Sequence, residues 1–283
     1  MITSKFSYKK ATSVEDALSI LAASGEEAKI LAGGHSLIPA MKLRLNSPET
    51  LIDISRIESL SYIRESNGQL QIGAGTTHGQ IEHSSAVQQA IPMLSEAAGM
   101  IGDPQVRNRG TLGGSIAHAD PAADWPALLL AGNASVHLQS GSGSRVVSAG
   151  DFFMGLFMTA LQENELITAI SFPLPGDGHR STYQKFTQPA SRFALCGCAA
   201  ALELKGSTIT KASIAYSGVS AKPFRDGKVE GALVGQQLNA ATIEAASQHA
   251  AENVSVMSDH FASERYRKHL TKVYTARALE ALL

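Results

Sequence analysis

The sequence has few cysteines, and this shortage limits the chemistry that the chain can carry out alone. Only two of its 283 residues are cysteine, Cys196 and Cys198. An iron–sulfur cluster normally needs four cysteine ligands, so this chain is not expected to hold one by itself. A disulfide across a C-x-C spacing would be strained. We therefore predict two buried thiols in a reducing compartment.

A surplus of positive charge and a long hydrophobic run are also missing. The formal net charge is −1, whereas a nucleic acid or an anionic membrane as partner would call for a basic surplus. The longest apolar run, FALCGCAAALEL, is shorter than the roughly 18 to 20 residues of a membrane helix. The first residues, MITSKFSYKK, lack the hydrophobic region of a signal peptide. We predict a cytoplasmic protein with no membrane span and no nucleic-acid partner.

The composition that remains is that of a globular protein with more than one domain. Apolar residues make up 44% of the chain and charged residues 17%, and a chain of this length suits two or three domains. The segment LPGDGHRS is the best linker candidate, because Pro175, Gly176 and Gly178 lie between two apolar segments. The residues after it are predicted to form a separate α+β unit.

Local patterns predict several elements. The segment TSVEDALSILAAS reads as a helix with a capping box formed by Thr12 and Glu15. Asn67-Gly68 predicts a β-hairpin, and Lys205-Gly206 lies at the turn of a second strand pair. The segment DPQVRNRGTLGGSIAHADPAAD has no periodicity and is predicted to be a long functional loop.

Two glycine pairs suggest a ligand. Gly33-Gly34 follows an apolar run and precedes a helix-like run, which is typical of a phosphate-binding loop. Gly113-Gly114 is its counterpart, and a small hydroxyl residue, Ser36 or Ser115, follows each pair. Without a Cβ, the backbone can approach an anion closely and direct N–H donors at its oxygens. Neither pair has the lysine of a P-loop or an evident magnesium ligand, so we predict a diphosphate that is bound but not cleaved, as in a dinucleotide cofactor.

Two acidic residues follow the second glycine pair. Asp120 and Asp124 lie too close to the glycines to face phosphate, and they are candidates to accept hydrogen bonds from ribose hydroxyls or an adenine amino group. Asp120-Pro121 also fits the start of a turn, and Asp124 also fits the cap of the helix WPALLLA. From these residues alone both interpretations stay open.

Three segments together resemble a known family: AGGHSLIPAMKLRL, IGDPQVRNRGTLGGSIAHADPAAD and YQKFTQPASRFALCGCAAALEL. They closely resemble the FAD-binding medium subunit of molybdenum hydroxylases, which include aerobic carbon monoxide dehydrogenase and xanthine dehydrogenase. The resemblance covers essentially the whole chain. It implies an α+β fold, with an FAD-binding PCMH region of the vanillyl-alcohol-oxidase type followed by an α+β CO dehydrogenase flavoprotein C-terminal domain. The expected boundaries are 1–175 for the FAD-binding region, with subdomains of about 1–57 and 58–175, and 179–283 for the C-terminal domain.

The resemblance also implies which residues bind FAD. The first pyrophosphate loop of the family falls on residues 32–36, and the second falls on residues 111–115, with Ser115 where asparagine is common. The full cofactor-binding set is Ala32, Gly33, Gly34, His35, Ser36, Leu37, Ile101, Thr111, Leu112, Gly113, Gly114, Ser115, Asp124, Ile167 and Lys185. No catalytic acid or base and no metal ligand are expected, and His35, His78, His83 and His118 are interpreted as ordinary polar residues.

The implied function is electron transfer. In this family a substrate is hydroxylated at a molybdopterin centre in a large subunit, and electrons pass through two [2Fe–2S] clusters in a small subunit. They reach non-covalently bound FAD in the medium subunit and then an external acceptor such as a quinone, NAD or oxygen. A dimer of heterotrimers is expected. Arg107 and Arg109 either lend positive potential near the phosphates or face a partner subunit.

Two other functions remain as alternatives. One is a stand-alone FAD-dependent reductase of the same fold, such as the enolpyruvoyl-UDP-GlcNAc reductase, although the C-terminal unit offers no evident acid–base constellation. The other is a non-enzymatic, nucleotide-sensing module. A Rossmann protein is excluded by pattern, because the chain has no GxGxxG motif.

Overall fold

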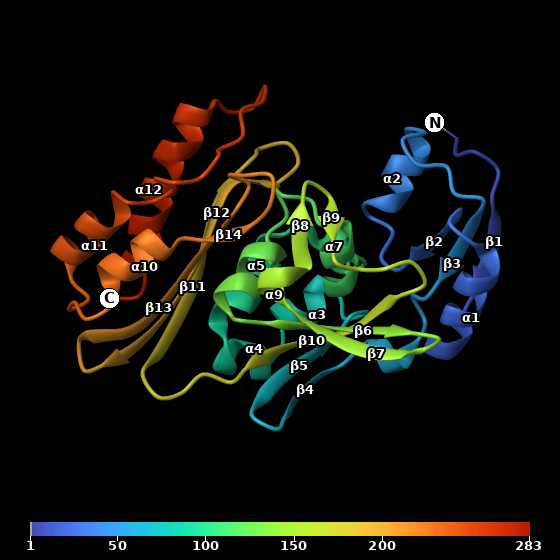
Figure 1. The fold of residues 1–283 in the computed structure, drawn as a ribbon, viewed down its shortest axis with the longest axis horizontal. Helices are drawn as coiled ribbons and strands as arrows, with labels where there is room; N and C mark the ends of the chain where they lie inside the picture. Colours follow the sequence, from blue (N-terminus) through green and yellow to red (C-terminus); the bar gives the residue numbers. More distant parts are fainter. Residues whose placement is uncertain (1) are drawn as a thin grey trace.

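The computed structural model describes residues 2–283, which form three units arranged along one long axis (Figure 1). Each unit is built on its own sheet, and the two ends of the chain lie in opposite end units (Figure 1). Within the described residues, none of the helices is both long and apolar enough to cross a membrane.

The amino-terminal unit is a small parallel sheet with strand order β1-β3-β2. Its elements are β1 (Ser7–Lys10), α1 (Val14–Ser24), β2 (Ala28–Leu31), α2 (Leu37–Lys42), β3 (Thr50–Asp53) and the 3-10 helix η1 (Glu58–Leu60). The buried face of α1, which includes Ala17 and Leu18, contributes to one core cluster with Ile52 of β3. This small core fixes the strand that leads into the first glycine pair.

The capping prediction for α1 was wrong by one residue. Ser13, and not Thr12, is the N-cap, because its extended backbone directly precedes the helix and its side chain accepts from the N–H of Asp16. Thr12 instead donates through its backbone and its hydroxyl to the Asp16 carboxylate. The helix was predicted correctly, and only the residue that starts it differs.

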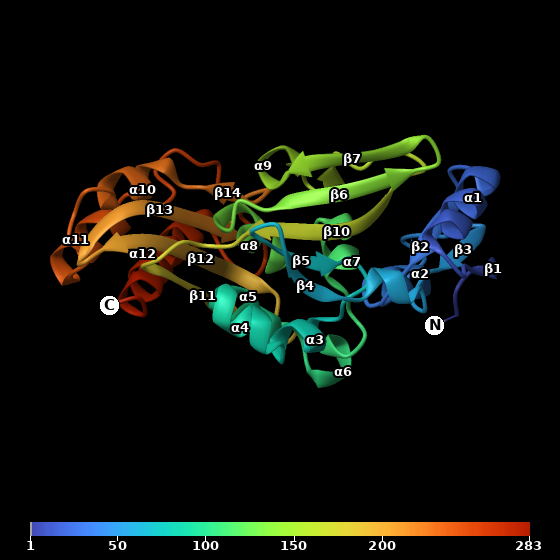
Figure 2. The ribbon, with the colours of Figure 1, turned by 90° about the horizontal axis from the view of Figure 1, so that it is seen from below.

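The middle unit is a five-stranded antiparallel sheet with strand order β4-β5-β10-β6-β7. Its elements are β4 (Ile63–Ser66), β5 (Gln69–Gly73), α3 (His78–Glu82), α4 (Ser85–Ala90), α5 (Pro92–Met100), α6 (Pro104–Arg107), α7 (Leu112–His118), α8 (Trp125–Ala131), β6 (Ser135–Ser140), β7 (Gly143–Ser148), α9 (Ala149–Phe152), β8 (Phe153–Gly155), β9 (Met158–Thr159) and β10 (Leu166–Pro173). Figure 2 separates the five strands from the group of helices α3 to α6. The predicted hairpin is confirmed, since Asn67 and Gly68 both have positive φ between β4 and β5.

The segment 103–124 is not the structureless loop that was predicted. Asp103 caps α6 by accepting from the N–H of Val106, and Thr111 caps α7 by accepting from the N–H of Gly114. The helices contain only 4 and 7 residues. Elements this short do not complete a helical hydrophobic repeat, so periodicity could not reveal them.

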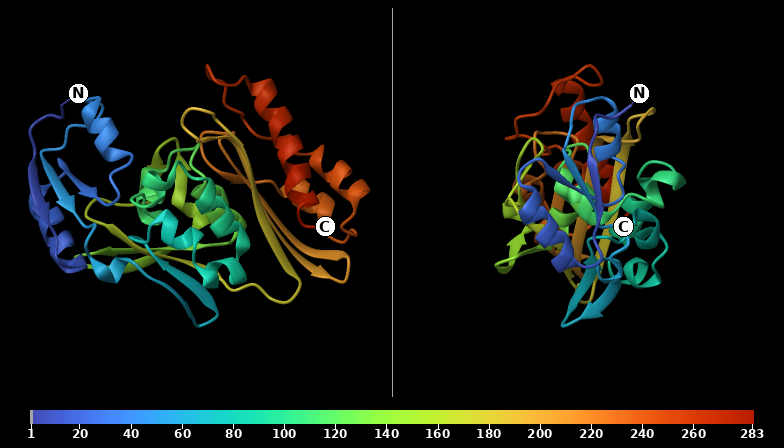
Figure 3. Two further views of the ribbon diagram at one scale, coloured as in Figure 1. Left: turned by 180° about the vertical axis from the view of Figure 1, so that it is seen from behind. Right: turned by 90° about the vertical axis from the view of Figure 1, so that its right-hand side faces the viewer.

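The carboxy-terminal unit is an antiparallel sheet with strand order β11-β12-β13-β14, covered on its outer face by helices (Figure 3). Its elements are β11 (His179–Thr187), β12 (Ala194–Lys205), β13 (Thr208–Ser217), β14 (Phe224–Arg225), α10 (Gly227–Leu233), α11 (Ala240–Ser247) and α12 (Glu264–Glu280). The strand pair around Lys205-Gly206 is confirmed as β12 and β13, whereas β11 and α10 are not among the predicted elements. The inner face of this sheet contributes Tyr183 and Ala199 to the core of the middle unit.

Candidate functional site

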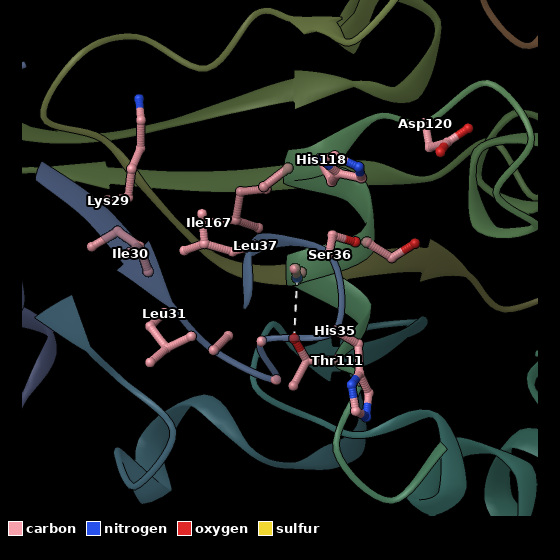
Figure 4. A pocket seen from close by; sticks show the side chains of 18 of the residues that line it. Lys29, Ile30, Leu31, His35, Ser36, Leu37, Thr111, His118, Asp120 and Ile167 are labelled. Atoms are coloured by element: carbon pink, nitrogen blue, oxygen red, sulfur yellow. Dashed lines mark hydrogen bonds between the residues drawn. The ribbon is translucent and has the colours of Figure 1, made fainter. Parts of the chain in front are cut away.

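A cavity of about 1290 Å³ collects side chains from all three units. Its wall includes β2 and the residues up to α2, the start of α7, the loop before β10, and residues 191–193 of the carboxy-terminal unit. Ligand pockets for drug-sized molecules occupy ~300 to 1,000 Å³, so this cavity suits a larger ligand. In Figure 4, Lys29 of β2 lies on one side of the view, and His118 and Asp120 lie on the other.

The first glycine loop presents a row of backbone donors without partners. Within residues 2–283, the N–H groups of residues 33, 34, 35, 36 and 37 donate to no protein acceptor, and the first internal bond runs from the N–H of Ile38 to the carbonyl of Gly34 at 3.0 Å. All five residues line the cavity. Gly34 has φ 78°, a left-handed conformation that favours glycine. Adjacent unpaired N–H groups can form an anion-binding concavity, so this loop has the donors that its predicted role requires, and anion binding stays a prediction.

The second glycine loop differs from the prediction, because its backbone donors are already engaged. Leu112 and Gly113 donate to the carbonyl oxygens of Thr76 and Ala74 at 3.0 and 2.9 Å. The N–H of Gly114 donates to Thr111 Oγ1 at 3.2 Å, which is the dashed line in Figure 4. Thr111, Gly114 and Ser115 line the cavity, but this loop does not offer it a row of free N–H groups.

The two loops lie against each other, which the sequence predicts from their shared pattern. A Cβ atom at Gly33 would lie 2.2 Å from the carbonyl oxygen of Arg109 and 2.8 Å from the Cα of Gly110. A Cβ atom at Gly113 would lie 2.5 Å from the Cβ of Ala74. Gly33 and Gly113 are therefore needed because backbone segments pack closely around them, a reason that the sequence did not disclose.

Two side chains of the carboxy-terminal unit donate hydrogen bonds to the acidic residue Asp124. The hydroxyl of Tyr183 donates to Asp124 Oδ1 at 2.5 Å, and Lys185 Nζ donates to Asp124 Oδ2 at 2.9 Å and to the carbonyl of Met100 at 3.0 Å. Burial raises the pKa of Asp124, while Lys185 and Tyr183 oppose that rise. Asp124 precedes α8 but its side chain does not cap that helix, so the capping interpretation was wrong for this residue.

Asp120 begins a turn, as one of its two interpretations predicted. Its Oδ1 accepts from the N–H of Ala122 at 2.9 Å, and its carbonyl accepts from the N–H of Ala123 at 3.0 Å. The residue also lines the cavity, so the turn places a carboxylate at the edge of the site. A ribose or adenine contact for Asp120 stays a prediction.

Most of the predicted cofactor-binding set comes together in the cavity wall. The members that line it are Ala32, Gly33, Gly34, His35, Ser36, Leu37, Ile101, Thr111, Gly113, Gly114, Ser115, Asp124 and Ile167. Leu112 and Lys185 are buried and are not part of the wall. Lys185 lies behind Asp124, so in this structure its contact with the site runs through that carboxylate.

Arg107 and Arg109 are not part of the wall either. Arg107 Nε donates to Glu82 Oε2 at 2.7 Å, and its Nη1 donates to the carbonyl of Ile101 at 3.3 Å. The structure thus gives Arg107 a role in holding α3 and the end of α5 together. Among the described residues, no group of three His, Cys, Asp or Glu side chains could hold a metal ion. Cys196 and Cys198 are buried free thiols, as predicted.

One residue of the wall, interpreted as an ordinary polar residue, has surroundings that the sequence does not reveal. His78, at the first turn of α3, is 4% exposed and lines the cavity. Trp125 Nε1 donates to His78 Nδ1 at 3.1 Å. Burial, with smaller contributions from the nearby His35 and Arg107, lowers the pKa of His78 to about 4. Nothing in the local sequence marks this residue, because its partner lies 47 positions along the chain.

Comparison with known proteins covers the whole length of the chain. Residues 4–175 match the family model described as the FAD binding domain in molybdopterin dehydrogenase, and residues 181–282 match the CO dehydrogenase flavoprotein C-terminal domain. The chain is 40% identical over 280 residues to the glyceraldehyde dehydrogenase medium chain of Sulfolobus acidocaldarius, and the match covers 99% of both chains.

Two solved structures are similar along the entire chain. One is the carbon monoxide dehydrogenase from Hydrogenophaga pseudoflava that lacks the Mo-pyranopterin moiety, with a TM-score of 0.96 and 40% identity over 100% of this chain and 98% of that one. The other is the quinoline 2-oxidoreductase from Pseudomonas putida 86, with a TM-score of 0.94 and 32% identity over 100% of this chain and 98% of that one. The three-unit arrangement described above is therefore shared with chains of these two enzymes.

Proposed function

Because this chain belongs to the family of FAD-binding medium subunits of molybdenum hydroxylases, we propose that it is the electron-transfer subunit of such a complex. It receives electrons from the [2Fe–2S] clusters of a small subunit and passes them through FAD to an external acceptor. The substrate is oxidised at the molybdopterin centre of a large subunit. The complex is a cytoplasmic dimer of heterotrimers, and the buried free thiols Cys196 and Cys198 fit a reducing compartment.

The observation that carries this proposal is the row of unpaired backbone donors at residues 33–37 in a cavity of about 1290 Å³. A diphosphate needs several donors and brings no hydrogens of its own, so the row matches it in chemistry. Gly34 allows the turn that exposes these donors, and Thr111 and Ser115 add hydroxyls from the facing loop. Residues of β2 and residues 191–193 line the same cavity.

The residues of the chain bind and orient the cofactor and exclude water, and no side chain acts as an obligatory acid or base. When bound, FAD supplies the redox chemistry, because a flavin accepts and releases electrons singly or in pairs. Ile101, Leu37 and Ile167 give the cavity apolar walls. Asp124 adds a polar group, which Lys185 and Tyr183 hold in place. Binding is non-covalent.

The experiment is a spectrum of the chain purified alone and with the subunits encoded by neighbouring genes. We expect flavin absorption in both preparations, and acid precipitation should release FAD into the supernatant. Mixing the oxidised chain with the chemically reduced iron–sulfur subunit, freed of excess reductant, should bleach the flavin band. A matched sample with the oxidised iron–sulfur subunit controls for dilution and quenching.

The outcomes separate the alternatives. A colourless chain that takes up no added FAD would falsify the cofactor assignment. A bound flavin that stays oxidised in the presence of the reduced iron–sulfur subunit contradicts the electron-transfer role and favours a nucleotide-binding module. A bound flavin that turns over a substrate without any partner subunit favours the stand-alone reductase.

A further inference from the structure

His78 is a buried imidazole whose two nitrogens have different surroundings. Nδ1 faces the indole of Trp125 at 3.1 Å, deep in the middle unit. Nε2 faces the second glycine loop, since a Cβ atom at Gly110 would lie 2.8 Å from it. No protein acceptor within residues 2–283 bonds to Nε2, although the residue is 4% exposed and lines the cavity. Nε2 is not among the fully buried unpaired atoms of the described residues, so it keeps some exposure, and because His78 lines the cavity this nitrogen can donate to a ligand there.

The contact with Trp125 fixes where the proton of the imidazole lies. An indole N–H can only donate, so Nδ1 must accept and must carry no hydrogen. In the neutral ring the hydrogen is then on Nε2. The tautomer therefore follows from the chemistry of the partner.

The same contact keeps the ring neutral. Protonation of Nδ1 would direct two N–H donors at each other across 3.1 Å, and burial already disfavours the charged form. The lowered pKa of about 4 agrees with this arrangement. A neutral, directional donor in a buried site avoids the desolvation cost of a charged lysine or arginine.

The Nε2–H group lies where the two glycine loops meet. The backbone N–H of His78 donates to the carbonyl of Gly110 at 3.0 Å, which fixes the start of α3 against the second loop. Gly110 in turn contacts Gly33, the first residue of the row of unpaired donors. The imidazole donor therefore stands next to the end of that row.

We propose that His78 is a further binding residue for the cofactor, whose Nε2–H donates to an oxygen of the FAD diphosphate while Trp125 holds the tautomer. The inference rests on the proposed function, because it takes the ligand of the glycine loops to be a dinucleotide. It assigns to the site a side-chain donor that comes from neither pyrophosphate loop. Trp125 acts through His78 and is a positioning residue.

The test measures the affinity of the full-length, cofactor-stripped chain for FAD and for riboflavin, which has no phosphate. We expect His78→Leu to weaken FAD binding by about tenfold to a hundredfold, the usual effect of a lost hydrogen bond to a charged group. Its effect on riboflavin binding should be less than about threefold. His78→Gln, whose amide nitrogen can reach the position of Nε2, should recover part of the affinity for FAD.

Two controls keep the result interpretable. His83→Leu changes an exposed histidine at the end of the same helix, α3, and should leave both affinities unchanged. Nitrogen-15 NMR of the wild-type chain should show one histidine protonated at Nε2 and accepting at Nδ1, and Trp125→Phe should shift that signal toward a mixture of tautomers. If His78→Leu shows no cooperative melting transition, His78→Phe, which keeps an aromatic ring but has no hydrogen-bond donor, takes its place in the comparison.

Each outcome has a distinct meaning. A wild-type chain that binds no FAD removes the proposed function and this inference together. A wild-type chain that binds FAD, with His78→Leu equally tight, overturns the inference alone. Equal losses for FAD and riboflavin assign His78 a structural role, and an Nδ1-protonated ring in the NMR spectrum excludes the donor that we propose.

Discussion

At the scale of single residues, Gly33 is needed for the close contact between two loops as well as for binding the ligand. The carbonyl of Arg109 occupies the space that a Cβ at position 33 would need, at 2.2 Å. Gly33→Ala must therefore push the loops apart, and overpacking of this kind costs about 1 to 3 kcal/mol. We expect a lower melting temperature together with loss of most bound FAD, measured as the ratio of flavin to protein absorbance.

The control for this substitution is Gly231→Ala. Gly231 lies within α10, and a Cβ there would meet nothing within 4 Å. Replacing glycine by alanine in a helix stabilises by about 0.5 to 1 kcal/mol, so this variant should melt slightly higher and keep its FAD. If Gly33→Ala also keeps both its stability and its flavin, the close approach of the loops is not needed for binding.

The sequence identified these glycines but not the reason for each. A Gly-Gly pair after an apolar run predicts a turn that can hold an anion, and residues 33–37 have the free N–H groups that this role requires. The donors of Gly113 and Gly114 are instead bonded within the chain. Which of two similar motifs keeps its donors free depends on what packs beside it, and Ala74 and Thr76 lie too far away in sequence for any local pattern to show this.

His78 also predicts how stability depends on pH. Its pKa is about 4 in the folded chain and about 6.5 in an unfolded one. Between these values the unfolded state binds the extra proton, so the free energy of unfolding falls as the pH falls from about 6.5 to about 4, by up to about 3 kcal/mol in total. The stabilisation is complete above pH ~6.5.

The measurement is urea unfolding of the cofactor-free chain at a series of pH values. Burial also lowers the pKa of His137 and His179, so the wild-type chain alone does not isolate one residue. The comparison is with His78→Gln, which cannot titrate and should show a shallower loss between pH 6.5 and 4. Parallel curves for the two chains would contradict the assignment of this acid sensitivity to His78.

At the scale of elements, the residue between the two thiols of the C-x-C motif in β12 must be glycine, because a neighbouring ring occupies the space of its Cβ. Tyr183 of β11 pairs with Ala199, and its hydroxyl lies where a Cβ of Gly197 would be, at 2.1 Å. Gly197→Ala should therefore displace this ring and break its bond to Asp124. We expect destabilisation of about 1 to 3 kcal/mol, measured by chemical denaturation.

A double-mutant cycle tests this explanation. Tyr183→Phe removes the clashing hydroxyl and the bond to Asp124, at a cost of about 1 to 3 kcal/mol. If the two residues act through this contact, the double variant should be destabilised by less than the sum of the single variants, by at least about 0.5 kcal/mol. Additive costs would show that Gly197 is required for another reason.

The elements that were predicted correctly share a local signal. Asn67-Gly68 has the backbone preference of its turn, and α1 has a buried face that repeats with helical spacing. The elements that were missed lack such a signal. The helices α6 and α7 are too short to repeat, and β11 is a strand whose buried face is set by β12 and α5, which lie at distant positions in the sequence. In these cases tertiary packing decides the structure, and a local pattern cannot report it.

At the scale of the whole molecule, the carboxy-terminal unit has a core cluster of its own and also shares the core of the middle unit. The core of the middle unit includes Tyr183, Ala199 and Ala215 from the carboxy-terminal sheet. The loop before α8 is fixed by the same sheet, since Ala194 and Gly218 donate to the carbonyls of Ala122 and Pro121. The amino-terminal unit has its own small core, to which Leu166 is the contribution from β10. The middle and carboxy-terminal units should therefore unfold together, and the amino-terminal unit should open at lower cost.

Hydrogen exchange followed by mass spectrometry tests this difference in opening cost, and FAD should slow exchange more in one unit than in the others. In the cofactor-free chain, peptides from residues 7–53 should exchange faster than peptides from β10, β12 and β13.

A ligand that binds only the closed arrangement stabilises it by RT ln(1 + [L]/Kd), which is about 2.7 kcal/mol at a hundredfold excess over Kd. Because the cavity wall joins residues 29–37 to α7 and β10, saturating FAD should slow exchange most in the amino-terminal unit. Uniform protection without FAD, or protection by FAD confined to the carboxy-terminal sheet, would show that the cofactor does not bridge the units in this way.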